Sequence, residues 1–267
     1  MKLAISDIAW GQELDEAVYE HMLSQGVTGL EIAPTRWLSS KHPYEETKRA
    51  GVEAKKLKER GISLVSMQSL WYGKTGRIAE SREKYLELLD YTKQAIDFAK
   101  EISCKNLVFG NPTARTVEQE EDLKLLHDFF EEAGAYAAAA GVVIAMEANP
   151  AIYHTNFLTT TREALDFVKQ LSSPGCKINL DLGTILCNQE EISWLLKERD
   201  WIHHVHISEP HLAVIKKRGL HRELAGLLTQ MEFVGAVSIE MKRGASREEI
   251  FQAMDYVAEV FSNGKIC

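Results

Sequence analysis

The sequence predicts one closed (β/α)8 TIM barrel that uses the whole chain, residues 1–267, as a single domain. Short β-type runs alternate with longer amphipathic, charge-bearing runs, and the pattern repeats about every thirty residues, the size of a βα unit. No Pro/Gly/Ser-rich linker interrupts the alternation. Eight strands alternating with eight helices favour a barrel over an open doubly wound sheet. Such a sheet would also need a glycine-rich turn after its first strand, and SDIAWGQ (6–12) has no GxGxxG motif.

The eight predicted strands are short apolar runs rich in β-branched residues. They are KLAIS (2–6), GLEIA (29–33), ISLVSM (62–67), NLVFG (106–110), VVIAME (142–147), KINLDL (177–182), IHHVHI (202–207) and AVSIEM (236–241). Helices with recognisable ends are predicted between them, at 81–102, 116–141, 160–175 and 246–261. Ser81 caps the first of these helices and Gly141 stops the second. Thr160 or Thr161, with Glu163, starts the third.

Composition and charge narrow the function classes. Hydrophobic residues at 45% and charged residues at 26% are typical of a soluble globular enzyme or binding protein. The net charge of −8 argues against DNA or RNA as a partner, because such binding usually depends on Lys and Arg to neutralise phosphates. No apolar run approaches the ~18 residues of a membrane span, and the first residues lack the apolar core of a signal peptide. We therefore expect a cytoplasmic protein without a membrane partner.

The cysteines indicate a reducing compartment. None of the four forms a CxxC pair, so we expect free thiols at Cys104, Cys176, Cys187 and Cys267.

Four consecutive strands end with a polar residue on the same face. Alternate strand residues point into a barrel, and functional groups gather at the carboxyl ends. In the run 142–147, Val143, Ala145 and Glu147 share the inward face. In the seventh strand His204 and His206 face inward, whereas His203 and Val205 face outward. The inward strand ends are then Glu147, Asp181, His206 and Glu240.

These four side chains predict a divalent metal site. Three carboxylates and an imidazole meeting at one barrel mouth would repel one another unless a cation lay among them. Taken singly, a strand-end carboxylate often caps the next helix and a His is commonly a hydrogen-bonded core residue. The four together, in register, favour ligation. Oxygen-rich ligation with one nitrogen suits Mn2+, Mg2+ or Co2+ better than a structural Zn2+; Mn2+ is the first choice and Zn2+ stays an alternative.

The segments around these residues resemble the xylose isomerase-like TIM-barrel superfamily. They are MEANP (146–150), NLDLGT (179–184), HHVHISEP (203–210) and VSIEMK (237–242). The superfamily includes sugar phosphate isomerases and epimerases, ketose 3-epimerases and endonuclease IV-type enzymes. The resemblance implies a metal held by Glu147, Asp181, His206 and Glu240, with Glu147 and Glu240 also moving protons on opposite faces of a substrate. It is also compatible with a homo-oligomer, because relatives are often dimers or tetramers.

The implied activity is that of a divalent-metal-dependent sugar isomerase or epimerase, which transfers protons on a small carbohydrate or derivative through a metal-bound enediolate. Two departures from the ketose 3-epimerases indicate that this chain can share their metal ligands and still act on a different substrate. Those enzymes carry a sugar-contacting His where this chain has Thr184 and an Arg where it has Leu212. A lyase or dehydratase acting on a keto-sugar or inositol-like substrate is the first alternative, and a non-catalytic carbohydrate-binding barrel is another.

An endonuclease-type phosphodiesterase is less favoured. The trinuclear zinc cluster of endonuclease IV needs additional histidines after several strands. Here the corresponding segments read SMQSLW (66–71), VFGNPTAR (108–115) and DLGT (181–184), and no DxH follows HISEP (206–210). The acidic net charge indicates the same conclusion.

Further residues at strand ends and in the following loops are candidates for substrate binding. They are Glu31, Gln68, Trp71, Asn149, Asn156, Glu209, His211 and Arg222. Glu31 has an internal hydrogen-bond network as its alternative, and Trp71 either lines an apolar wall for a sugar or packs within its loop. Glu209 has an alternative role in orienting the metal ligands. Arg222 begins a helix that could hold a phosphate. Arg36, Arg115 and Lys242 also follow strands, and most such cations are surface charge.

Overall fold

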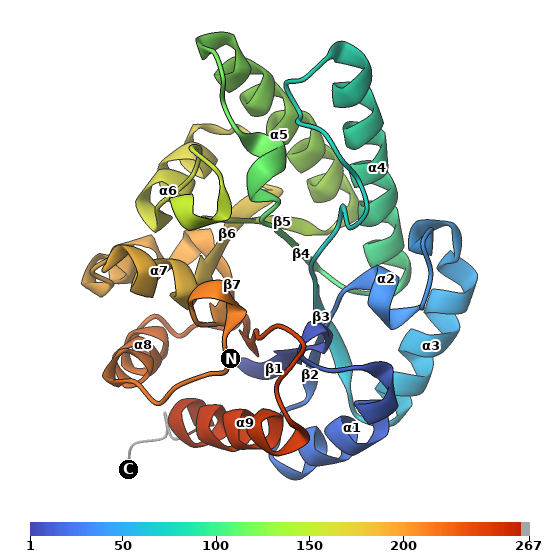
Figure 1. Cartoon of the computed structure of the whole chain (residues 1–267), viewed down its shortest axis with the longest axis vertical. Helices are drawn as coiled ribbons and strands as arrows, with labels where there is room; N and C mark the ends of the chain where they lie inside the picture. The colour runs from blue at the N-terminus through green and yellow to red at the C-terminus, as the bar shows by residue number, and fades with distance from the viewer. Residues whose placement is uncertain (263–267) are drawn as a thin grey trace.

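The computed structural model describes residues 1–262, which form a closed barrel of eight strands (Figure 1). Each strand pairs in parallel with the next along the chain, and β8 pairs with β1. The strands are β1 (Lys2–Ser6), β2 (Gly29–Ile32), β3 (Ser63–Met67), β4 (Asn106–Phe109), β5 (Val143–Glu147), β6 (Cys176–Asp181), β7 (Ile202–Ile207) and β8 (Ala236–Ile239). The predicted barrel fold and all eight predicted strands are confirmed. Residues 263–267, which the predicted domain includes together with Cys267, lie outside the described part.

An outer ring of helices surrounds the strands (Figure 1). It comprises α1 (Asp15–Ser24), α2 (Pro34–Trp37), α3 (Thr47–Glu59), α4 (Arg82–Glu101), α5 (Glu120–Ala140), α6 (Thr161–Gln170), α7 (Leu182–Asn188), α8 (Gly219–Gln230) and α9 (Arg247–Ser262). The predicted end signals are present. The Ser81 hydroxyl accepts from Lys84 N, and Gly141 ends α5 with φ +72°. The hydroxyl of Thr160, rather than Thr161, accepts from Glu163 N.

The outward, apolar face of the barrel strands packs against the surrounding helices. Ile144 and Met146 of β5, and Val205 of β7, are fully buried there, as strand parity predicts. Burial of such side chains is the main favourable term in folding. The thiols of Cys104, Cys176 and Cys187 are free. No helix within residues 1–262 combines the length and apolar character needed to cross a membrane.

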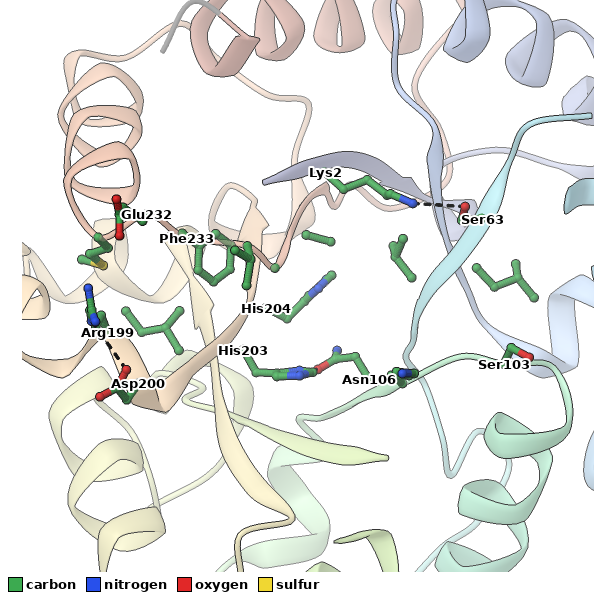
Figure 2. Close-up of a pocket in the computed structure, with 18 residues that line it drawn as sticks. Lys2, Ser63, Ser103, Asn106, Arg199, Asp200, His203, His204, Glu232 and Phe233 are labelled. Atoms are coloured by element: carbon green, nitrogen blue, oxygen red, sulfur yellow. Dashed lines mark hydrogen bonds and ion pairs between the residues drawn. The ribbon is translucent and has the colours of Figure 1, made fainter. Parts of the chain in front are cut away.

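His203 breaks the predicted alternation in β7. The pairing of β6 with β7 shifts between Ile178, whose partner is Ile202, and Asn179, whose partner is His204. His203 is therefore an extra residue, and a bulge of this kind redirects its side chain. His203 Nδ1 lies 2.7 Å from Asn106 Oδ1 of β4, and both residues line a cavity at the amino ends of the strands (Figure 2). The prediction that His203 faces outward with Val205 is wrong for this reason.

Candidate metal centre

The carboxyl ends of β5 to β8 bring Glu147, Asp181, His206 and Glu240 together. One ligand atom from each of the four lies within 4.8 Å of the others, and all four residues are buried. His206 Nδ1 lies 3.1 Å from Glu147 Oε2 and 3.2 Å from Glu240 Oε2. Glu240 comes one residue after β8, and its backbone N donates to Ile207 O at 2.9 Å, which keeps it beside β7. The four inward strand ends of the sequence thus form one cluster.

Glu147 and Asp181 are each oriented by several donors. Glu147 Oε1 accepts from Asn149 Nδ2 at 2.8 Å, and Glu147 Oε2 accepts from Asn179 Nδ2 at 2.7 Å. Asp181 Oδ2 accepts from the backbone N and hydroxyl of Thr184 at 2.7 and 2.9 Å. Asp181 Oδ1 accepts from the Ser208 hydroxyl. Asp181 therefore caps α7 and also belongs to the cluster.

The protein shifts the pKa values of the three carboxyl groups differently. Burial opposes ionisation of Glu147, but hydrogen bonds from the imidazole and two asparagine amides hold its pKa below the ordinary value. Burial, with the charges of Glu147 and Glu31, raises the pKa of Glu240. Burial, with the charges of Glu147 and Glu240, raises the pKa of Asp181 to about 7. Carboxyl groups whose environments separate their pKa values are candidates for distinct acid and base roles.

Glu31 orients the imidazole of His206 from behind. Glu31 Oε2 lies 3.0 Å from His206 Nε2 and 2.9 Å from His204 Nε2, and the Glu31 side chain is fully buried. The positive charge of His206 and hydrogen bonds from both imidazoles outweigh burial and hold the pKa of Glu31 well below its usual range. A carboxylate that accepts from one ring nitrogen leaves the other free to bind a metal. Glu31 thus directs Nδ1 of His206 toward the three carboxylates.

The donor set fits a divalent cation. Three carboxylates and one imidazole nitrogen offer hard oxygen ligands with a single nitrogen, as Mn2+, Mg2+ and Co2+ prefer. Burial is outweighed by the surrounding carboxylates, which raise the pKa of His206 well above its ordinary value. A cation among these groups would instead favour the neutral imidazole and the ionised carboxylates. A second group of potential ligands, Glu31, His204 and His206, shares the imidazole of His206.

A cavity also lies at the other end of the barrel. It has a volume of about 670 Å³ and is lined by residues at the amino ends of strands, among them Lys2, Ser63, Asn106 and Ala236 (Figure 2). Ligands of TIM-barrel enzymes bind at the carboxyl ends of the strands. The carboxylate cluster, rather than this cavity, is therefore the candidate site.

Three of the predicted substrate-binding residues contact the cluster. Gln68 Nε2 donates to Glu240 Oε1 at 2.9 Å and to the Ser6 hydroxyl at 2.8 Å. Asn149 contacts Glu147, and Glu31 contacts His206. In this structure Gln68, Asn149 and Glu31 form hydrogen bonds with the predicted metal ligands. For Glu31 this is the internal hydrogen-bond network that the sequence offered as an alternative to substrate binding.

The other five predicted substrate-binding residues make no hydrogen bond to the four strand-end side chains within residues 1–262. Trp71 is buried in edge-to-face contact with Phe109 and Phe129, and Trp71 Nε1 donates to the Thr92 hydroxyl. The Asn156 amide bonds the backbone N and O of Val117. Glu209 accepts twice from the Arg218 guanidinium, at 2.7 and 2.5 Å. The remaining two, His211 and Arg222, are exposed.

Two residues near the cluster were not predicted to act there. Arg115 is fully buried, so the expectation of surface charge is wrong for it, because the loop after β4 folds inward over β5. Asn179 has the inward parity of Asp181 and was identifiable from that signal alone. Nothing in the sequence pairs Arg115 with its distant partners.

Comparisons with known proteins identify the family of this chain. A sequence profile described as xylose isomerase-like TIM barrel matches residues 20–260. No protein with a curated description matches the chain.

Solved structures share the fold at low sequence identity. A D-psicose 3-epimerase from Clostridium cellulolyticum H10, solved with D-tagatose, aligns over 100% of both chains with 15% identity and a TM-score of 0.78. A 3-keto-D-glucoside 4-epimerase from E. coli aligns over 100% of both chains with 18% identity and a TM-score of 0.72. A family 2 AP endonuclease from Brucella melitensis covers 97% of this chain and 99% of its own, with 17% identity and a TM-score of 0.75. Because the profile spans nearly all of the sequence, this chain belongs to the xylose isomerase-like TIM-barrel family.

Proposed function

We propose that the protein is a divalent-metal-dependent sugar isomerase or epimerase that acts by proton transfer beside a carbonyl group. The observation that carries the proposal is the pair Glu147 and Glu240. Both are buried, both approach Nδ1 of His206, and the pKa of Glu147 is lowered while that of Glu240 is raised. A base and an acid held at one site are what enolisation followed by reprotonation requires.

The residues divide the work as follows. Glu147, Asp181, His206 and Glu240 would hold the cation, which would polarise the substrate carbonyl and stabilise the enediolate charge. Glu147 removes the proton on the carbon next to the carbonyl, and Glu240 returns a proton to the opposite face. Return to a different carbon gives isomerisation, and return to the opposite face of the same carbon gives epimerisation.

The fold relatives support a sugar substrate. Two of the aligned structures are named as epimerases of sugars, D-psicose and a 3-keto-D-glucoside. The start of α7 supports a different sugar from that of the ketose 3-epimerases. Thr184 stands where they carry a substrate-contacting His, and its hydroxyl is 2.9 Å from Asp181 and 2.7 Å from Ala148 O. Thr184 is therefore committed to the protein interior.

Solvent exchange tests the proposal. The Mn2+-loaded protein is incubated in D2O with a panel of ketoses and keto-sugars, and the recovered sugars are analysed by NMR and mass spectrometry. Deuterium is expected at the carbon alpha to the carbonyl, and not after EDTA treatment. No exchange across the panel, with one Mn2+ bound per chain, would contradict the proposal. Loss of water would indicate the lyase alternative, and cleavage of abasic DNA would indicate the endonuclease.

A further inference from the structure

A fully buried arginine lies directly behind the carboxylate cluster. Arg115 ends a single turn of 3-10 helix, Pro112–Arg115, that follows β4, and its side chain has no solvent exposure. Nη1 donates to Glu147 O at 2.8 Å. Nη2 donates to Asn149 Oδ1 at 2.9 Å and approaches Leu158 O at 3.4 Å. All three partners are neutral oxygens.

Burying this guanidinium without an ion-pair partner lowers the stability of the folded protein. A buried charge is normally paired with an opposite charge, yet no carboxylate within residues 1–262 is in ion-pair contact with Arg115. Burial lowers the pKa of Arg115 to about 10, so the guanidinium stays charged at neutral pH. The carboxylate that favours this charge is that of Glu147, which Arg115 reaches only through Asn149.

The contacts form a continuous chain from Arg115 to Glu147. Because Asn149 Oδ1 accepts from Arg115, the amide cannot turn over, and its Nδ2 must face Glu147 Oε1 at 2.8 Å. Arg115 also fixes the backbone of Glu147 through its carbonyl oxygen. The other oxygen, Oε2, then lies 3.1 Å from His206 Nδ1 at the centre of the cluster.

Gly110 limits the space beside Glu147 and Asn149. Gly110 follows β4, and a Cβ added there would lie 3.1 Å from Glu147 Oε1 and 3.4 Å from Asn149 Oδ1. The carboxylate and the amide therefore lie in a narrow slot beside the backbone of Gly110.

We propose that Arg115 is a positioning residue that acts through Asn149 to hold the Glu147 carboxylate toward the metal centre. This inference rests on the proposed function, because the proposed function makes Glu147 a metal ligand. Residues that orient metal ligands typically contribute about 10- to 100-fold in metal affinity. A purely structural Arg115 would instead fasten the loops after β4 and β5 without changing how Glu147 binds a metal.

A double-mutant cycle on Mn2+ affinity tests the proposal. Arg115→Lys keeps the positive charge but removes the bidentate guanidinium donor, and Asn149→Ala removes the side-chain amide. Titration calorimetry should show Mn2+ binding weakened about 10-fold or more by each change, and no further by both together, because both break one chain of contacts. Arg36→Lys is the matched control. Arg36 is also largely buried after a strand, but it pairs with Asp7 and Asp15. It should bind Mn2+ like the wild type.

A metal-free readout separates this proposal from the proposed function. Crystal structures of the wild type and of Arg115→Lys, both treated with EDTA, should show the Asn149 amide released from Glu147 only in the variant. Wild-type protein that fails to bind Mn2+ would contradict the proposed function, and the crystal structures would still decide on Arg115. An unchanged Asn149–Glu147 contact in Arg115→Lys, unchanged Mn2+ affinity, or additive effects of the two substitutions would overturn the proposal.

Discussion

Replacing Glu147 by glutamine should lower the stability of the metal-free protein, whereas replacing Glu240 by glutamine should not. The two residues have the same side chain, are both buried and approach the same imidazole nitrogen. They differ in their hydrogen bonds and in the direction in which their pKa values are shifted. That difference underlies the assignment of base and acid, so it is the feature to test.

The cost of Glu147→Gln follows from its two donors. Both carboxylate oxygens accept from amide NH2 groups, so either orientation of a glutamine sets its own NH2 against Asn149 or Asn179. Asn149 cannot turn over while Arg115 holds its oxygen. One buried donor left without a partner costs about 1–3 kcal/mol. In a protein of this size, about 2 kcal/mol lowers the melting temperature by about 4–8 °C.

Glu240→Gln meets a different environment. Glu240 Oε1 accepts one hydrogen bond, from Gln68, which a glutamine oxygen can accept equally well. The substitution also removes a negative charge that burial, Glu147 and Glu31 disfavour more than the charge and hydrogen bond of His206 favour it. We expect the melting temperature of metal-free Glu240→Gln to equal or exceed that of the wild type, by up to about 4 °C for about 1 kcal/mol.

Thermal unfolding in EDTA at neutral pH, followed by circular dichroism, measures both effects. Glu223→Gln on the exposed face of α8 controls for the change of side chain itself and should melt with the wild type. The reasoning is refuted if Glu147→Gln melts as high as Glu240→Gln, or if the two substitutions lower the melting temperature equally.

Three further predictions concern the site and its surroundings. Because the pKa of His206 is raised well above its ordinary value and that of Asp181 is raised to about 7, Mn2+ must displace a proton from His206 at neutral pH and a second proton from Asp181 below about 7. Its affinity should therefore fall as the pH drops, most steeply below about 7, and calorimetry in buffers of different ionisation enthalpy should detect proton release; a pH-independent affinity would contradict this. Gly110→Ala should push Glu147 aside and weaken Mn2+ binding about tenfold, measured by the same titration, whereas wild-type affinity would show that the slot is not tight. Trp71→Ala should cost about 3–5 kcal/mol in chemical denaturation and leave Mn2+ affinity unchanged, whereas a small cost or weaker binding would show that Trp71 serves the site.

Strand parity was sufficient to predict the candidate ligands. β5 to β8 are buried on their outward faces, so the two-residue period of a strand leaves one orientation for Glu147 and the other strand ends. The same rule failed at His203, because the bulge arises from the pairing of β6 with β7 and has no signature within β7 alone. The sequence of one strand thus predicts which face each side chain occupies, but it does not predict a bulge that arises from pairing with the neighbouring strand.

The residues that orient the ligands could not be assigned from sequence. Glu31 and His206 are separated by 175 positions and meet only because the barrel closes. Gln68 was expected to face a substrate, and its contact with Glu240 depends on the pairing of β8 with β1 as well as on the loop after β3. Arg115 binds backbone carbonyls, which every sequence offers equally. Their partners are set by tertiary structure.

An anomalous difference map from crystals grown with Mn2+ tests the central claim most directly. The account predicts one peak per chain within coordination distance of Glu147, Asp181, His206 and Glu240, on the Nδ1 side of the imidazole. A peak on the Nε2 side, among Glu31, His204 and His206, or a fully bound Mn2+ elsewhere with the four strand ends empty, would contradict it.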